Sequence, residues 1–174
     1  LKRNKSQKDY FTIATLLKPF DYKSSFIYGG EARFDNMKAW YLGNGFDEVI
    51  EEKDYKNPIF RSTWGVSDED LVIKANERFK EYFANGEKFV SVMFSSSNHT
   101  PFELPDGKIE FEKNVPKNSV ENAIKYADFA IGKFFEMAKQ EEYYKNTVFV
   151  VVADHNVRVY GNEIVPIDMF QIPA

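Results

Sequence analysis

Residues 148–156 read VFVVVADHN, a run of apolar residues that ends in Asp154 and His155. A short and almost wholly apolar run predicts a strand buried on both faces, as in the sheets of α/β proteins. A carboxylate and an imidazole directly after such a strand are two possible ligands for a divalent metal ion. The stretch therefore predicts both a parallel sheet and a candidate site at the end of one of its strands.

Upstream of this run, the spacing of apolar residues predicts helices. Between 118 and about 144 the apolar residues recur every three or four positions, which is the period of a helix face. A second helix is predicted over 68–86, with a capping box at Ser67. Two shorter helices are expected nearer the amino end, one over 36–42 and one that ends near Pro19.

Predicted strands alternate with these helices. They are KSSFIYGG (23–30), DEVI (47–50), KFVSVMF (88–94) and the opening run itself. This alternation is typical of an α/β sandwich around a mostly parallel sheet. We therefore predict an α/β fold in which helices cover both faces of a mostly parallel sheet.

The composition excludes several classes of protein. The chain has 174 residues, enough for a sizeable core, so one domain over 1–174 is predicted. Its net charge of −4 provides no general attraction to nucleic acid or anionic lipid. It has no cysteine, which excludes disulfides, thiolate metal sites and cysteine nucleophiles. The sequence contains no run of about 18 apolar residues, so neither a membrane span nor a signal peptide is predicted in it.

Polar residues follow three of the predicted strands, at the carboxyl ends where open parallel sheets bind their ligands. These segments are YGGEARFDN (28–36), SSSNHTPF (95–102) and ADHNVR (153–158). The only two histidines, His99 and His155, lie in two of them. We therefore predict that the three segments open on one edge of the sheet and that the two histidines face a common cleft.

Each segment also has a purely structural interpretation. Asp154 can cap a turn with His155 at the surface, and SNHTPF can be a turn stabilised by its polar side chains. The glycine pair at 29–30 is typical of a tight turn, and Trp64 is by default a core or rim aromatic. An Asp-His pair suits Mn²⁺, Zn²⁺ or a similar ion, but two ligands do not complete a site.

Several longer stretches together resemble the sulfatase family of the alkaline phosphatase superfamily, in particular its lipoteichoic acid synthase and phosphoglycerol transferase branch. They are SFIYGGEARFDNMKAWYLGNGFDEVI, STWGVSDED, SSSNHTPFE, NAIKYADFAIGKFFE, NTVFVVVADHNVRVYG and VPIDMFQIPA. They occur in the family's order over almost the whole chain. The resemblance implies an alkaline-phosphatase-like sheet and a sulfatase-type catalytic domain, and we expect both to be incomplete in this chain.

The resemblance implies a metal site at the opening run. Asp154 and His155 match a pair that supplies two ligands to one divalent ion, with Mn²⁺ or Mg²⁺ favoured and Zn²⁺ or Ca²⁺ as alternatives. Arg158 stands where sulfatases commonly continue with glycines, and we include it as a substrate-binding candidate. The family's first acidic ligand lies before everything matched here. We therefore expect the metal site to be empty in this chain alone.

The resemblance also implies a substrate site. His99 matches a histidine that holds the substrate phosphate, although Thr100 here separates it from the proline that follows. Asn98 lies beside it, and Trp64 resembles the aromatic that lines a glycerol-phosphate pocket. The family's threonine nucleophile has no match, because Thr12 and Thr15 fall within a predicted helix. We therefore predict no catalytic nucleophile in this chain and no turnover by it alone.

The leading functional hypothesis follows from the resemblance. The chain is expected to be part of a metal-dependent phosphoglycerol transferase of the bacterial cell envelope, with this domain on the outer side of the cytoplasmic membrane. Its substrate is expected to be a phospholipid head group, and its contact with the membrane is expected only through helices that this chain lacks. A sulfate-ester or phosphoethanolamine reaction on the same fold is one alternative. A non-catalytic remnant that binds polyol phosphates or glycans is another.

Overall fold

The computed structural model describes residues 7–155 and 167–174. Two compact units make up the chain, Leu1–Tyr144 and Lys145–Ala174. The first contains the sheet with its helices. The predicted single domain over 1–174 stays a prediction.

Three parallel strands form the sheet of the first unit. They are β1 (Tyr22–Tyr28), β2 (Glu48–Ile50) and β5 (Lys88–Phe94), in the order β2-β1-β5. β1 pairs with β5 along the full length of both strands and with β2 over a shorter stretch. The central strand is buried from Ser24 to Tyr28, as expected of a strand covered on both faces. The predicted α/β class with a parallel sheet is confirmed.

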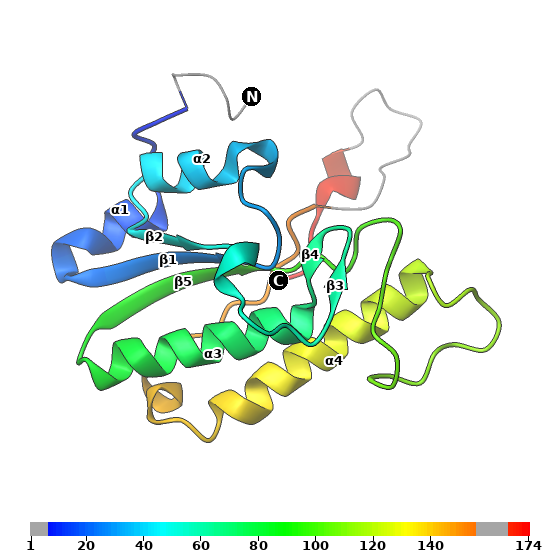
Figure 1. Cartoon of the computed structure of the whole chain (residues 1–174). Helices are drawn as coiled ribbons and strands as arrows, with labels where there is room; N and C mark the ends of the chain where they lie inside the picture. Colours follow the sequence, from blue (N-terminus) through cyan, green and yellow to red (C-terminus); the bar gives the residue numbers. More distant parts are fainter. Residues whose placement is uncertain (1–6, 156–166) are drawn as a thin grey trace. The chain divides into compact units, whose positions relative to one another are not determined.

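Four α-helices cover this sheet. In Figure 1, α1 (Ile13–Leu17) and α2 (Met37–Gly43) lie on one side, and α3 (Asp68–Ala84) and α4 (Val120–Ala138) lie on the other. A two-stranded antiparallel hairpin, not predicted from the sequence, precedes α3 and consists of β3 (Arg61–Ser62) and β4 (Gly65–Val66). The 3-10 helices are η1 (Lys18–Phe20), η2 (Phe34–Asn36), η3 (Glu52–Asp54), η4 (Glu142–Asn146) and η5 (Ile167–Phe170).

α3 begins at the predicted cap, Ser67, but without the complete capping box, and the end of α4 differs from the prediction. The Ser67 hydroxyl accepts from the Asp70 amide at 3.2 Å and donates to the Asp70 carboxylate at 2.6 Å, which caps α3. α4 stops at Ala138, before the predicted end near 144. The positions three and four residues after Ala138 are Glu141 and Glu142, and the ring of the next residue, Tyr143, packs edge-on against Phe79 of α3 at 5.8 Å. Tyr143 is buried but belongs to the separate 3-10 helix η4, so the helix ends where its apolar period ends and not at the next buried aromatic residue.

Aromatic rings fill the core on both faces of the sheet. On the α1 and α2 side, the fully buried Phe26 stacks on Tyr41 with ring centroids 3.7 Å apart. On the α3 side, Phe79 stacks on Phe89 of β5 at 4.9 Å. Alternate residues of each strand point to opposite faces, so the two halves of the core are built from the same strands.

The predicted strand at 148–153 is not formed, which corrects the sequence analysis. These residues carry no strand, and Val148 and Val150 are 89% and 76% exposed. Within their own unit, the Ala153 amide donates to the Pro173 carbonyl at 3.1 Å. A strand requires a neighbour that accepts and donates its backbone hydrogen bonds, and apolar composition does not identify that neighbour. Over the described parts of the chain, no helix is long and apolar enough to cross a membrane.

Candidate functional site

The parallel pairing of β1 and β5 places the segments that follow them at the same edge of the sheet. The segment after β1 begins at Gly29, and the segment after β5 begins at Ser95. The predicted common edge is therefore confirmed for these two segments. His155 belongs to the second unit, so the cleft that His99 and His155 were predicted to share stays a prediction.

Three glycines allow the β3–β4 hairpin to lie directly against the end of β1. The Val66 amide donates to the Gly29 carbonyl at 2.9 Å. A Cβ atom on Gly65 would lie 2.3 Å from the Gly29 carbonyl oxygen and 2.5 Å from the Gly30 Cα, and Gly65 has a φ of +117°. Such an approach and such a φ are open only to glycine. The glycine pair thus does more than form a turn, because it leaves the space in which the hairpin that carries Trp64 packs.

Trp64 and His99 lie side by side at this edge. Their ring centroids are 4.8 Å apart, with the planes inclined by 38°. Phe34, which follows β1, packs edge-on against Trp64 with centroids 5.3 Å apart. We call this group of Phe34, Trp64 and His99 the aromatic corner. Phe34 was not predicted as part of a site, because an isolated phenylalanine in an aromatic-rich chain carries no distinctive signal.

Two hydrogen bonds tie the hairpin to the loop after β5. The Trp64 indole Nε1 donates to the Thr100 carbonyl at 2.8 Å. The Thr63 amide donates to Glu103 Oε2 at 2.6 Å, and this bond lowers the pKa of Glu103. Asn98, a predicted substrate-binding residue, is exposed next to His99 in this loop. The loop and the hairpin therefore form one surface, with the aromatic corner at its centre.

The contacts of His99 determine which of its ring nitrogens is available. Nδ1 lies 3.2 Å from the Ser96 carbonyl oxygen. A carbonyl only accepts hydrogen bonds, so Nδ1 must carry a proton and Nε2 is left to meet a ligand. In the protonated ring, Nε2–H is a charged donor suited to a phosphate oxygen.

Glu51 connects the ends of β1 and β2 and was missed in the sequence. Its carboxylate accepts from the Ala32 amide at 3.1 Å, from Lys38 Nζ at 2.5 Å and from Lys53 Nζ at 2.9 Å. Burial alone would raise the pKa of Glu51, but these donors outweigh it and lower the pKa to about 2. In the sequence, Glu51 could have been recognised as a charged residue directly after the apolar end of β2.

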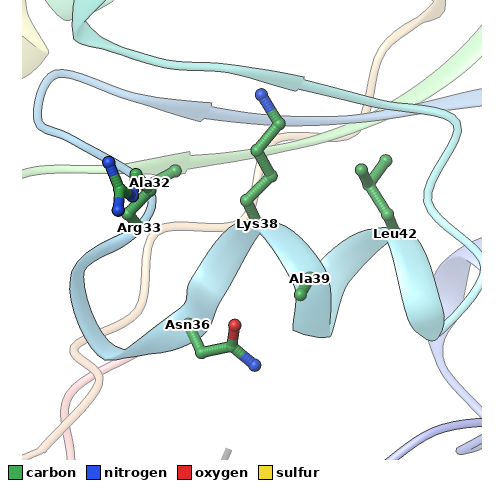
Figure 2. A pocket seen from close by; sticks show the side chains of 6 residues that line it. All are labelled: Ala32, Arg33, Asn36, Lys38, Ala39 and Leu42. Carbon is green, nitrogen blue, oxygen red and sulfur yellow. The ribbon is translucent and has the colours of Figure 1, made fainter. Parts of the chain in front are cut away.

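A hollow of about 580 Å³ lies beside α2, and Figure 2 shows the residues around it. Lys38 extends from α2 toward the strands, where its ammonium group contacts Glu51. Arg33 lies 3.8 Å from the Glu31 carboxylate. Both cations therefore have carboxylate neighbours, and the hollow does not gather groups aimed at one ligand. It is lined by Ala32, Arg33, Asn36, Lys38, Ala39 and Leu42.

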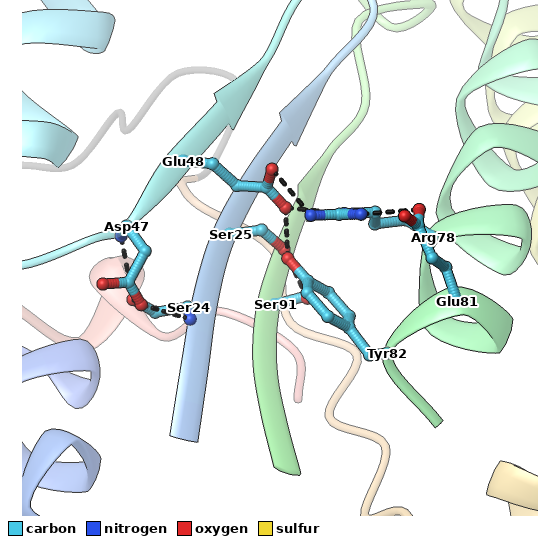
Figure 3. Close-up of polar contacts among 8 residues, drawn as sticks. All are labelled: Ser24, Ser25, Asp47, Glu48, Arg78, Glu81, Tyr82 and Ser91. Carbon is cyan, nitrogen blue, oxygen red and sulfur yellow. Dashed lines mark hydrogen bonds and ion pairs between the residues drawn. The ribbon is translucent and has the colours of Figure 1, made fainter. Parts of the chain in front are cut away.

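A further set of polar contacts joins the three strands of the sheet and connects them to α3 (Figure 3). Glu48, Ser25 and Ser91 stand in register on β2, β1 and β5. Arg78 of α3 donates to Glu48 at 2.8 and 3.0 Å, the Tyr82 hydroxyl donates to the same carboxylate, and the two serine hydroxyls are 2.6 Å apart. A slip of one residue would move these side chains to the opposite face. The contacts thus maintain the register that aligns the strand ends.

Asp154 and His155 lie next to each other in the second unit, and both are exposed. The His155 amide donates to Asp154 Oδ1 at 2.9 Å, and His155 Nε2 lies 3.5 Å from Asp154 Oδ2. A carboxylate and an imidazole are suitable donors, but metal sites normally need three or four protein ligands. Among the described residues, no group of three or more potential metal ligands occurs. Arg158 lies outside the described residues.

The fold and the aromatic corner define an α/β domain whose candidate functional residues His99 and Trp64 gather at the carboxyl ends of parallel strands. The family pattern named Sulfatase matches residues 2–170, so the chain belongs to the sulfatase family. A protein of the alkaline phosphatase superfamily from Vibrio parahaemolyticus has a similar structure, with a TM-score of 0.91 and 51% identity over 98% of this chain and 41% of that one. The predicted family is therefore confirmed.

Relatives with named activities are more distant. Phosphoglycerol transferase I of Escherichia fergusonii is 25% identical over 82% of this chain and 20% of its own length. The lipoteichoic acid synthase-like YvgJ of Bacillus subtilis is 26% identical over 87% of this chain and 25% of its own. The lipoteichoic acid synthase LtaP of Listeria monocytogenes has a TM-score of 0.68 at 26% identity, over 80% of this chain and 36% of that one. The chain thus spans about a quarter or less of the length of phosphoglycerol transferase I and of YvgJ.

Proposed function

We propose that this chain is part of the catalytic domain of a phosphoglycerol transferase and that the aromatic corner binds the glycerol-phosphate group. The observation that carries the proposal is the pairing of Trp64 with His99, whose ring centroids are 4.8 Å apart. An indole ring offers an apolar face to the glycerol carbons, and a protonated imidazole offers a charged donor to the phosphate. The named relatives support phosphoglycerol over other esters.

The proposal includes a divalent metal ion, with Mn²⁺ or Mg²⁺ favoured. Asp154 and His155 would supply two of its ligands, and further donors are required. When bound, such an ion neutralises phosphoryl oxygens. An anchored enzyme with this domain on the outer side of a bacterial cytoplasmic membrane is also part of the proposal, because its lipid substrates lie at a membrane.

The two threonines near the amino end fit a structural role and not that of a nucleophile. The Thr12 hydroxyl donates to the Asn44 carbonyl at 2.7 Å, and the Thr15 hydroxyl donates to the Thr12 carbonyl at 2.8 Å. Both residues cap α1. We therefore expect the 174-residue chain alone to turn over neither phosphoglycerol lipids nor aryl sulfates. Turnover by this chain would show that a nucleophile lies within it.

Calorimetric titration with glycerol 3-phosphate tests the proposed binding. We expect a Kd on the order of 1 mM, which corresponds to about −4 kcal/mol. His99→Ala should weaken binding about tenfold or more, because a hydrogen bond to a charged group contributes about 1.5–3 kcal/mol. Trp64→Ala should weaken it too, whereas Trp40→Ala, a matched change of the second tryptophan, should not.

The same titration distinguishes the alternatives. Tighter binding of inorganic sulfate than of glycerol 3-phosphate would favour a sulfate-ester enzyme. Equal binding by the parent chain and by His99→Ala would contradict the aromatic corner as the phosphate site.

A further inference from the structure

Asp68, the first residue of α3, reaches back from the helix to the loop that carries His99. Its side chain is buried, with the residue only 2% exposed. Oδ1 accepts from the Ser96 amide at 2.9 Å and from the Ser97 amide at 3.3 Å. The carboxylate therefore anchors the backbone at the start of the loop after β5.

Ser96 links this anchor to the aromatic corner. Its amide binds Asp68, while its carbonyl oxygen lies 3.2 Å from both the backbone nitrogen and the Nδ1 of His99. The peptide group between Ser96 and Ser97 thus stands in a short chain of hydrogen bonds, which runs from the Asp68 carboxylate through the Ser97 amide and the Ser96 carbonyl to the imidazole. Because the carbonyl requires a proton on Nδ1, its position determines the tautomer of His99 and the direction of Nε2.

A comparison with Asp70, two residues further along the same turn, separates this role from ordinary helix capping. Both oxygens of Asp70 are used, by the amides of Ile59 and Phe60 at 2.7 and 3.2 Å and by the Ser67 hydroxyl at 2.6 Å. Oδ2 of Asp68, by contrast, is buried without a hydrogen-bond partner among the described residues. Burial raises the pKa of Asp68, although the loop amides and the charge of His99 act in the opposite direction.

The hydrogen bonds of the Asp68 carboxylate go to amides of the loop after β5, which lies far from α3 in the sequence, so its burial has a role beyond helix capping. We propose that Asp68 is a positioning residue of the aromatic corner, which orients His99 and sets its tautomer through the peptide group between Ser96 and Ser97. The proposal rests on the proposed function in one respect, that His99 is the residue that meets the phosphate. Its structural part concerns the ligand-free protein and is tested without any ligand.

Nitrogen-15 NMR of the imidazole side chains reports the tautomer of His99 directly. In the parent chain at a pH where the ring is neutral, we expect Nδ1 to carry the proton. In Asp68→Ala, the loop amides lose their acceptor, and we expect His99 to move toward the Nε2–H tautomer that prevails in unconstrained histidine. Asp68→Asn retains one carbonyl oxygen for the two amides and should restore the Nδ1–H form.

Asp70→Ala is the matched control, since it removes a buried carboxylate of the same helical turn that does not contact the His99 loop. It should lower the melting temperature while leaving the His99 tautomer unchanged. An unchanged tautomer in Asp68→Ala, or the same tautomer change in Asp70→Ala, would overturn the proposal.

A measurement on the unsubstituted chain covers the case in which Asp68→Ala does not fold. Scalar coupling across the hydrogen bond should connect the Ser96 amide nitrogen with the Asp68 carboxylate carbon, and its absence would overturn the proposal. Titration with glycerol 3-phosphate then separates the two hypotheses. If the parent chain does not bind it, the proposed function fails while the tautomer result stands. If it does, titration at a pH where the ring is protonated should show Asp68→Asn binding within about twofold of the parent. Asp68→Ala should bind about tenfold more weakly, because the loop that orients the ring has lost its anchor.

Discussion

His99 and His155 each follow a run of apolar residues, but the two runs differ in the structure. Residues 88–94 form β5, which is paired with β1 along its whole length. Residues 148–152 form no strand, and the valine side chains of that run are exposed. An apolar run identifies a segment suited to a sheet, whereas an actual strand also depends on a neighbouring strand that the run itself does not specify.

The polar groups after the two runs differ in the same way. After β5, the loop is fixed by Asp68 from α3 and by Trp64 and Thr63 from the hairpin. Asp154 and His155 are exposed and hydrogen-bond to each other. The first region is therefore held in place by its own surroundings, whereas the second presents two exposed candidate ligands to which the described residues add no third.

The largest contrast is expected in stability. Phe26→Ala removes a fully buried ring from the core and should lower the free energy of unfolding by about 3–5 kcal/mol. Val150→Ala changes a side chain that is 76% exposed and should alter it by less than about 0.5 kcal/mol. Urea denaturation followed by circular dichroism measures both. A cost for Val150→Ala that approaches that of Phe26→Ala would show that the 148–152 run is buried in solution.

A second contrast concerns the close packing behind the aromatic corner. Gly65→Ala combines a positive φ with contacts below 3 Å and should cost about 2–3 kcal/mol. Gly107→Ala has a φ of +73° and nothing within 4 Å of the new Cβ, so about 1 kcal/mol is expected. Equal costs of the two changes in urea denaturation would mean that the hairpin does not need its contact with the end of β1.

A smaller effect is expected from the buried carboxylate after β2. The pKa of Glu51 falls from 4.5 to about 2 on folding, so its contribution is present above pH 4.5 and is lost as the pH falls toward 2. Glu51→Gln should therefore remove part of the loss of stability that the parent chain shows in this window. Parallel curves for Glu51→Gln and the parent would contradict the assigned pairing.

The smallest effect is expected for metal binding at the second histidine. Excess Mn²⁺ should stabilise the chain by less than about 1 kcal/mol, because two exposed ligands bind an ion weakly and stabilisation follows RT ln(1 + [L]/Kd). Thermal unfolding with and without Mn²⁺ measures this. Nanomolar affinity would show that Glu31, Asp35 or another carboxylate of this chain completes the site.

Much of the fold was predictable because local chemistry specifies it. The strand at 88–94 has its predicted bounds, and the helix after Ser67 begins at the predicted cap. The hairpin at 61–66 was not predictable, because its contact with Gly29 depends on packing between segments distant in the sequence. The prediction of a strand at 148–153 was wrong for a similar reason, since strand pairing is not a local property.

The candidate site was predictable only in part. His99 and Trp64 were singled out from the sequence, and the structure places their rings together. Asp68 was not, because an acidic residue at the start of a helix is common and favourable for helical reasons alone. Its contact with Ser96 becomes visible only when α3 and the loop after β5 are placed in space.

The central claim is that glycerol phosphate binds at the aromatic corner, and the fluorescence of Trp64 tests it most directly. In a Trp40→Phe background, Trp64 is the only remaining tryptophan of the chain. Glycerol 3-phosphate should then change the emission of Trp64 in a saturable way, and His99→Ala in the same background should shift the midpoint to about tenfold higher concentration. An emission that stays constant while calorimetry detects binding, or a midpoint that does not move in His99→Ala, would contradict the claim.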